Sequence, residues 1–125
     1  MSSLAKLAKA CFGDTAFYRE HDGFLIVATT EFLPGYDESI GLRMAYDGAG
    51  AVIVSDCHSV TDYWEVCGID PAPNKEEIGR IVEEHGLSFD GKTFSVVCDG
   101  GEEAAFCRDV TRFMQALRQL GAVNG

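Results

Sequence analysis

The sequence lacks the patterns that usually identify a metal or nucleotide site. Its five cysteines include no Cys-x-x-Cys pair, and its three histidines form no His-x-x-x-His, so a structural zinc site is not expected. It has no Asp-x-Asp-x-Asp-Gly calcium loop. The Asp99-Gly100-Gly101 segment lacks the lysine of a phosphate-binding loop, and two glutamates that would repel phosphate follow it. We therefore predict neither a metal nor a cofactor.

Long apolar runs are also absent. No run approaches the roughly 20 residues that span a bilayer, and Lys6 and Lys9 interrupt the first apolar stretch, which favours an amphipathic helix over a signal peptide. We therefore expect a cytoplasmic protein with reduced thiols, in which Cys67 and Cys107 occupy core positions. A length of 125 residues and a mean hydropathy near zero predict one globular domain, residues 1–125.

Basic residues are scarce and unevenly placed. The formal net charge is −10; residues 1–13 and 104–125 each carry +2, so residues 14–103 carry −14. Binding to nucleic acid or to an anionic membrane requires a positive surface, and we predict neither. The charge favours a protein partner with a basic surface, and the alternative is an acidic surface that serves only solubility.

Hydrophobic periodicity and turn residues predict an α+β fold: an antiparallel sheet of about six strands built from hairpins, with the helices packed mainly on one face. A loop is expected from Glu31 to Ile40, where Pro34 and Gly35 break the pattern. Ser59 is the expected N-cap of the helix over residues 60–67, which follows the fourth predicted strand. The expected helices are 2–11, 60–67, 75–85 and 102–120, and the expected strands are 17–20, 24–30, 42–46, 51–54, 87–89 and 93–98.

The corner between a predicted strand and the helix after it carries Asp56, Cys57 and His58. A cysteine near a helix N-terminus and next to an imidazole gains thiolate character, so Cys57 could act as a nucleophile, with His21 or His58 as its base and Asp56 as the orienting group. Neighbouring side chains in such a corner usually point in different directions. The alternative is that Asp56 caps the turn and His58 is simply exposed.

Five carboxylates could form an acid/base or metal site if the ends of two strands lie side by side. Acidic side chains at helix starts have a simpler explanation, because they interact favourably with the helix dipole. The five are Asp56, Asp62, Asp99, Glu102 and Glu103.

The predicted loop mixes aromatic, apolar and acidic side chains, which is typical of a protein-binding loop. The alternative is that its first two residues, Phe32 and Leu33, finish a strand and pack underneath. Trp64 is expected in the core, with Tyr63 beside it partly exposed. The predicted binding residues are Phe32, Leu33, Tyr36, Asp37 and Glu38 from the loop, with Asp56 and His58 from the corner.

From Phe24 to Leu120 the chain resembles an uncharacterised bacterial and phage family, domain of unknown function 1828. The resemblance rests on short segments: Val52-Ile-Val-Ser-Asp56, Cys67-Gly-Ile-Asp70, Gly86-Leu87 before Phe94-Ser-Val96, and Phe113-Met-Gln-Ala-Leu117. It implies a prophage or mobile-element setting and supplies no activity or site residue.

These observations predict a small acidic protein-interaction module, with an inhibitor of a host defence nuclease as the specific form that suits an acidic surface. The alternative is a small hydrolase that uses Cys57 as nucleophile or an aspartate-based metal site. A homodimer is compatible with either hypothesis.

Overall fold

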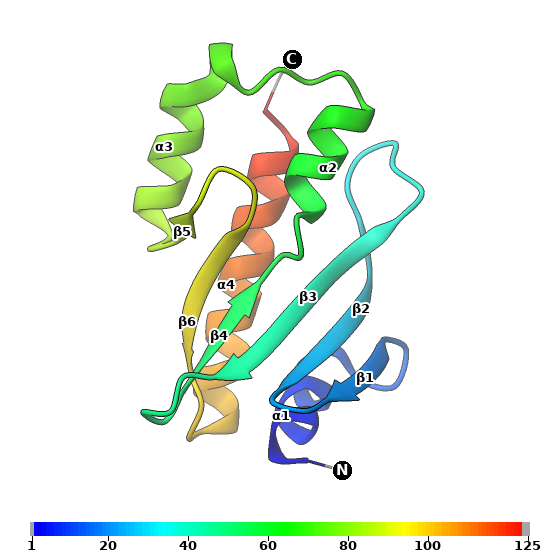
Figure 1. Ribbon diagram of the computed structural model, residues 1–125, viewed down its shortest axis with the longest axis vertical. Coiled ribbons are helices and arrows are strands. Elements are labelled where there is room, and N and C mark those ends of the chain that lie inside the picture. Colours follow the sequence, from blue (N-terminus) through cyan, green and yellow to red (C-terminus); the bar gives the residue numbers. More distant parts are fainter. Residues whose placement is uncertain (1, 124–125) are drawn as a thin grey trace.

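The computed structural model describes residues 2–123 of the chain (Figure 1). Four α-helices, one 3-10 turn and six strands follow one another in the order predicted, with the 3-10 turn as the one addition. The elements are α1 (Ser3–Phe12), β1 (Phe17–His21), β2 (Phe24–Phe32), β3 (Ser39–Tyr46), β4 (Ala51–Ser55), α2 (Ser59–Val66), η1 (Ala72–Asn74), α3 (Lys75–Glu84), β5 (Ser88–Phe89), β6 (Phe94–Asp99) and α4 (Glu103–Gly121).

The six strands form one sheet in the order β1-β2-β3-β4-β6-β5, and every neighbouring pair is antiparallel. Sequential hairpins build the first four strands. The chain then leaves the sheet through α2 and α3 and returns with the β5–β6 hairpin, which adds β6 beside β4. The predicted α+β class and the six-stranded antiparallel sheet are confirmed.

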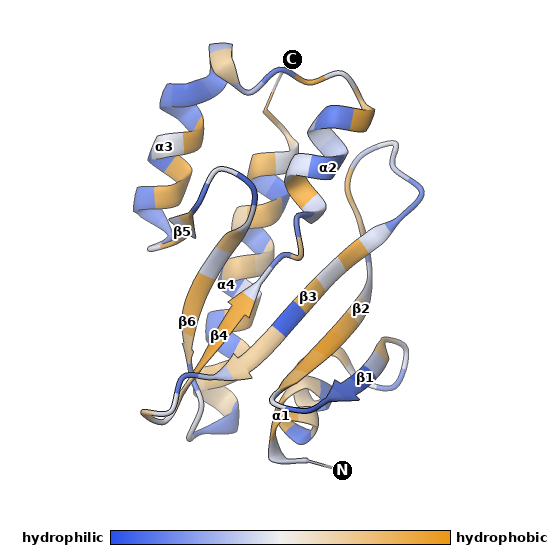
Figure 2. Cartoon of the chain, in the orientation of Figure 1, coloured by the Kyte–Doolittle hydropathy of each residue, from blue (hydrophilic) through white to orange (hydrophobic). Residues whose placement is uncertain are grey.

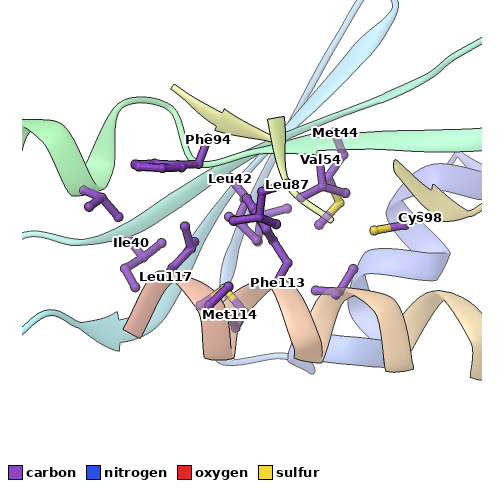
Figure 3. Close-up of a cluster of buried hydrophobic side chains, with 14 of the residues drawn as sticks. Ile40, Leu42, Met44, Val54, Leu87, Phe94, Cys98, Phe113, Met114 and Leu117 are labelled. Atoms are coloured by element: carbon purple, nitrogen blue, oxygen red, sulfur yellow. The ribbon is translucent and has the colours of Figure 1, made fainter. Parts of the chain in front are cut away.

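Alternation along the strands places one apolar face of the sheet against α4 (Figure 3). The sheet contributes fully or almost fully buried side chains from β2, β3, β4 and β6, and α4 contributes an apolar stripe of helical period. The core residues are Leu25, Val27, Ile40, Leu42, Met44, Val52, Val54, Phe94 and Cys98 from the sheet, with Phe106, Val110, Phe113, Leu117 and Leu120 from α4.

Helix α1 lies beside α4 on the same side of the sheet, whereas α2 and α3 pack against the C-terminal half of α4 (Figure 1). Residues that point to the other side of the sheet stay accessible, including Phe17, Ile53 and Val97, which are 81%, 42% and 63% exposed. On that side the Arg43 guanidinium stacks over the Phe24 ring at 4.4 Å. The helices therefore gather on one face, as predicted.

The predicted loop of residues 31–40 is shorter in the structure. Strand β2 continues to Phe32 and β3 begins at Ser39, with a bulge in their pairing between Ala28 and Phe32. The buried Thr29 hydroxyl donates to the Ile40 carbonyl at 2.7 Å and holds the strands together across the bulge. The turn is thus confined to residues 33–38, because the bulge absorbs the irregularity that the sequence placed in a longer loop.

The prediction that Cys67 is a core residue was wrong. Helix α2 ends at Val66, and its buried face consists of Val60, Tyr63 and Trp64. Cys67 follows the helix, where the chain turns away from the core at Gly68 with φ +70°, and it is exposed. Cys107 is half-buried, one position away from the stripe of α4 that faces the sheet.

Among residues 2–123, no helix combines the length and the apolar character that crossing a membrane requires.

A close backbone approach at the end of β6 yields the first prediction. A Cβ added at Gly100 would lie 2.7 Å from the Gly50 carbonyl oxygen and 3.2 Å from a Val52 methyl, whereas one at Gly101 would come no nearer than 3.7 Å to Asp99. We expect Gly100→Ala to lower the free energy of unfolding by about 1–3 kcal/mol, because backbone must move. The matched control, Gly101→Ala, should stay within about 0.5 kcal/mol. Urea denaturation measures both, and equal values would contradict the packing described.

Candidate functional site

The Asp56 carboxylate is completely buried at the point where β4, α2 and β6 meet. Its Oδ1 accepts the backbone N–H groups of Phe94 at 3.0 Å and His58 at 3.3 Å, and its Oδ2 accepts that of Val60 at 3.1 Å. Burial raises the pKa of Asp56, and the three N–H donors act in the opposite direction. Asp56 therefore supplies the cap of α2 that the sequence assigned to Ser59. The Ser59 hydroxyl instead lies 3.1 Å from the Gly41 N–H and accepts from it.

Cys57 and His58 both occupy the left-handed region of backbone space, with φ of 51° and 63°. Non-glycine residues rarely adopt this conformation, and two in succession reverse the chain sharply. The reversal brings the first amides of α2 back over the Asp56 carboxylate, as the hydrogen bonds to His58 and Val60 show.

This geometry gives Cys57 no catalytic partner among the described residues. No hydrogen bond joins its thiol to His58, and His21 stacks on Phe24 at 4.5 Å in the β1–β2 hairpin. Burial and the neighbouring Asp56 raise the pKa of the half-buried Cys57 thiol, while Arg43 acts weakly in the opposite direction. A raised pKa leaves less thiolate at neutral pH, which is the reverse of what a cysteine nucleophile needs.

The five carboxylates considered for a metal or acid/base site are not brought together. In the antiparallel register Asp99 lies opposite Ala51, at one end of β4, whereas Asp56 follows the other end and accepts the amide of Phe94. Five residues of strand separate the two positions, roughly 16 Å. The described residues contain no group of three or more His, Cys, Asp or Glu side chains that could hold a metal ion. Asp99 instead holds the turn that precedes α4, with Oδ1 accepting the N–H groups of Gly101 and Glu102.

The structure does unite the corner with the β2–β3 loop. The two segments line a recess of about 180 Å³ that is open to solvent. Tyr36 forms part of its wall, and its ring meets that of Tyr63 edge-on, with centroids 5.5 Å apart. The lining residues are Leu33, Tyr36, Glu38, Ser39, Ile40, Gly41, Cys57, Ser59 and Asp62.

One tyrosine, Tyr36, and two carboxylates, Glu38 and Asp62, line this recess, and Tyr63 packs behind Tyr36. The Tyr36 hydroxyl donates to Glu38 Oε2 at 3.2 Å, and the Tyr63 hydroxyl donates to the Pro34 carbonyl at 3.0 Å, which ties the loop to α2. Partial burial, the hydrogen bond to Glu38 and the charges of Glu38, Asp62 and Asp37 raise the pKa of Tyr36. The recess therefore combines an aromatic wall with a strongly negative rim.

The predicted binding residues have different environments. Tyr36 and Glu38 line the recess and Asp37 is exposed beside it. Leu33 is 2% exposed and packs closely against Gly121 of α4, whereas Phe32 ends β2 with 54% of its surface exposed. The packing alternative is therefore confirmed for Leu33 and wrong for Phe32, and the binding role of the pair stays a prediction. Of the remaining two, Asp56 is buried beneath the corner, and His58 is half-buried at the surface of the corner.

The charge is unevenly distributed in space, which the order of residues along the chain does not reveal. Segments 31–38 and 56–90, which together we call the acidic end, hold twelve of the 20 acidic residues and only two of the ten basic ones, Lys75 and Arg80. Their net charge equals the −10 of the whole chain, and the other residues are balanced at eight acidic and eight basic. Ten of the twelve acids are exposed, with Glu31 and Asp56 as the exceptions.

The acidic end occupies one end of the molecule. The β2–β3 loop, α2 and α3 lie together at the top of Figure 1, while α1 and β1 lie at the bottom. Hydrophilic residues dominate the outward side of α3 in Figure 2. Arg80 is paired with Glu84 at 2.7 Å, and Arg118 of α4 reaches this end and pairs with Glu31, so two basic groups are already engaged there.

Comparisons with protein-family models, with curated proteins and with solved structures each returned no match. The resemblance to domain of unknown function 1828 thus stays a prediction, and function has to be argued from the geometry of this chain.

Replacing Asp56 tests the corner. Asp56→Ala leaves two buried N–H groups and one part-buried N–H group without their acceptor, and we expect it to lower the free energy of unfolding by about 2–4 kcal/mol. Asp90→Ala is the control: that exposed carboxylate also accepts two N–H groups, those of Lys92 and Thr93, but water can replace it, so the loss of stability should be smaller.

The effect of Asp56→Ala should also depend on pH. The pKa of Asp56 in the folded chain lies above the ordinary 3.8. At pH values between these two pKa values, the folded chain therefore holds a proton that the unfolded chain has released. The advantage of wild type over Asp56→Ala should therefore be greatest near and below pH 3.8 and decline as the pH rises through the folded pKa. An advantage that grows over this range would mean that the N–H donors outweigh burial.

Thiol reactivity tests the hydrolase alternative. We expect iodoacetamide to modify the half-buried Cys57 more slowly than the exposed Cys67 at neutral pH, because burial and Asp56 disfavour the thiolate. Peptide mass spectrometry over time gives both rates in one sample. Faster modification of Cys57 than of Cys67 would support a nucleophilic role.

Proposed function

We propose that this protein is a small interaction module that binds a basic protein surface through its acidic end. One observation carries the proposal: the entire net charge lies in segments 31–38 and 56–90, and the rest of the chain is neutral. A charge needed only for solubility could be spread over the whole surface. Its concentration at one end creates a directed field, which attracts an oppositely charged partner and orients it during approach.

The recess suits a cationic side chain within such a partner. Glu38 and Asp62 lie on its rim, and the Tyr36 ring forms a wall against which an apolar stem or a guanidinium can pack. An arginine placed there would pair with a carboxylate and stack on the aromatic ring at once. The volume of about 180 Å³ accommodates a single side chain rather than a separate folded element. The recess thus adds a specific contact to an otherwise diffuse attraction.

Inhibition of a host defence nuclease is the specific form of this function that we propose. Proteins that bind nucleic acid carry a positive channel whose attraction for phosphate is electrostatic and sensitive to salt. An acidic end of this kind would compete with the nucleic acid for that channel. The prophage or mobile-element setting comes solely from the family resemblance, whereas the charge argument stands without it.

Paired charge reversals separate specific binding from net charge. The double variant Asp37→Lys with Glu38→Lys changes two exposed acids beside the recess, and Asp14→Lys with Asp22→Lys makes the same charge change among exposed acids outside the acidic end. Affinity capture from bacterial lysate at low and high salt, read by mass spectrometry, identifies the partner. Titration with that purified partner then measures both variants.

We expect a basic, nucleic-acid-binding partner whose capture weakens steeply with salt. The loop variant should bind it at least about tenfold more weakly, and the control variant should stay within about threefold of wild type. Equal losses in the two variants would show that net charge alone matters. Unchanged binding by the loop variant would refute the acidic end as the binding surface.

A further inference from the structure

Two cysteines that are far apart in the sequence meet between the first and last helices. Cys11 lies in the last turn of α1, and Cys107 lies in the second turn of α4, 96 positions later. Their sulfur atoms are 2.9 Å apart, which is about 0.9 Å longer than a disulfide bond of about 2.05 Å. Both side chains are half-buried, so each thiol retains some contact with solvent.

The packing of α1 on α4 explains why the two sulfurs meet. The inner face of α1 is formed by Leu4, Ala5 and Ala8, and the two alanines let the helices approach closely. Cys11 is three residues beyond Ala8 and continues that face by one turn. Gly13, with φ +69°, ends the helix, and its N–H donates to the Lys9 carbonyl, which fixes the turn that carries Cys11.

We propose that Cys11 and Cys107 form an intramolecular disulfide that joins α1 to α4. The reaction requires an oxidant, for which glutathione disulfide is sufficient. The thiolate of one cysteine attacks a sulfur of glutathione disulfide, forms a mixed disulfide and releases one glutathione thiolate. The other cysteine, after losing its proton, attacks the protein sulfur of the mixed disulfide and releases the second glutathione. The two cysteines are oxidised by two electrons, and glutathione disulfide is reduced to two glutathione molecules.

The other three cysteines are less suited to this bond. Cys98 lies close enough to Cys11 to help raise the pKa of that thiol, but it is 1% exposed beneath α4, where an oxidant cannot reach it. Cys57 lines the recess near the β2–β3 loop, and Cys67 is exposed after α2. Among residues 2–123, neither of these two thiols forms a hydrogen bond with another cysteine. The geometry thus selects one pair out of ten.

Closing this bond would join positions that are 96 residues apart in a chain of 125 residues, and the stabilisation by a disulfide increases with the length of the loop that it closes. It would also fasten the N-terminal helix to the body of the protein. The pair lies where α1 packs on the N-terminal half of α4, at the opposite end from α2 and α3 (Figure 1). The disulfide can therefore be tested independently of the proposed binding at the acidic end.

The experiment uses the full chain, reduced, freed of reductant and incubated with glutathione disulfide at mildly alkaline pH. Remaining thiols are blocked with N-ethylmaleimide before mass analysis. Digestion needs a glutamate-specific protease together with trypsin, because no lysine or arginine separates Cys98 from Cys107, whereas Glu102 and Glu103 do. Cys11→Ser and Cys107→Ser each remove one partner, and Cys98→Ala and Cys67→Ser are the matched controls.

We expect the oxidised chain to lose two hydrogen atoms in mass, with the peptide containing Cys11 linked to the peptide containing Cys107. Its melting temperature should exceed that of the reduced chain by at least about 5 °C. Both effects should disappear in Cys11→Ser and Cys107→Ser and persist in the two controls. Five blocked thiols after oxidation, or a crosslink that involves Cys57, Cys67 or Cys98 in place of this pair, would overturn the proposal.

Discussion

The buried carboxylate of Asp56 joins three elements of this fold: the end of β4, the start of α2 and the start of β6. It accepts one N–H from the start of β6 and two from the chain that enters α2, directly after the end of β4. A charge-bearing group this deeply buried is costly unless its oxygens are fully hydrogen-bonded, and both oxygens of Asp56 are. The position of α2 relative to the sheet depends on this cap, because the two residues that precede the helix have the left-handed conformation that the cap helps to sustain.

From that anchored helix the acidic end is assembled. Tyr63 of α2 is 4% exposed and reaches the Pro34 carbonyl, so the β2–β3 loop rests on the helix, and Leu33 beneath it packs on Gly121 of α4. Trp64 on the next position donates its indole N–H to the Leu120 carbonyl at 3.0 Å and fixes α2 against the end of the long helix. These contacts hold apolar and aromatic side chains inside, so the carboxylates of the same segments remain on the surface. Water and salt weaken the repulsion between these carboxylates. Their negative charge remains available to attract a cationic partner.

The opposite end of the molecule is built differently. There α1 lies along α4 with small side chains between them, and the local charges balance. A thiol pair, rather than a set of hydrogen bonds, spans that contact. The two ends are separated by the length of the sheet, so the proposed binding surface and the proposed disulfide involve different residues.

Local patterns in the sequence determined the class of fold. Alternating apolar residues in β2 to β4, glycines in the tight turns and the stripe from Phe106 to Leu120 specify hairpins and a long amphipathic helix, because burial of one face requires those periods. The same patterns identified Asp56 as a capping candidate and Trp64 as core, and they placed the net charge outside the two ends of the chain. These patterns did not predict the strand ends near residues 31–39 or the exposure of Cys67. The position of a β-bulge or of a helix end depends on packing rather than on composition.

Only the tertiary structure decided what lies side by side. The crossover through α2 and α3 puts β6 next to β4, and this register separates Asp99 from Asp56 although the sequence allowed them to meet. The same crossover carries the Asp56 corner to the β2–β3 loop, and it gathers segments 31–38 and 56–90 at one end. Cys11 meets Cys107 because two helices from opposite ends of the chain cover the same face of the sheet. Contacts of this kind depend on the direction and order of the strands, and side-chain periodicity specifies neither.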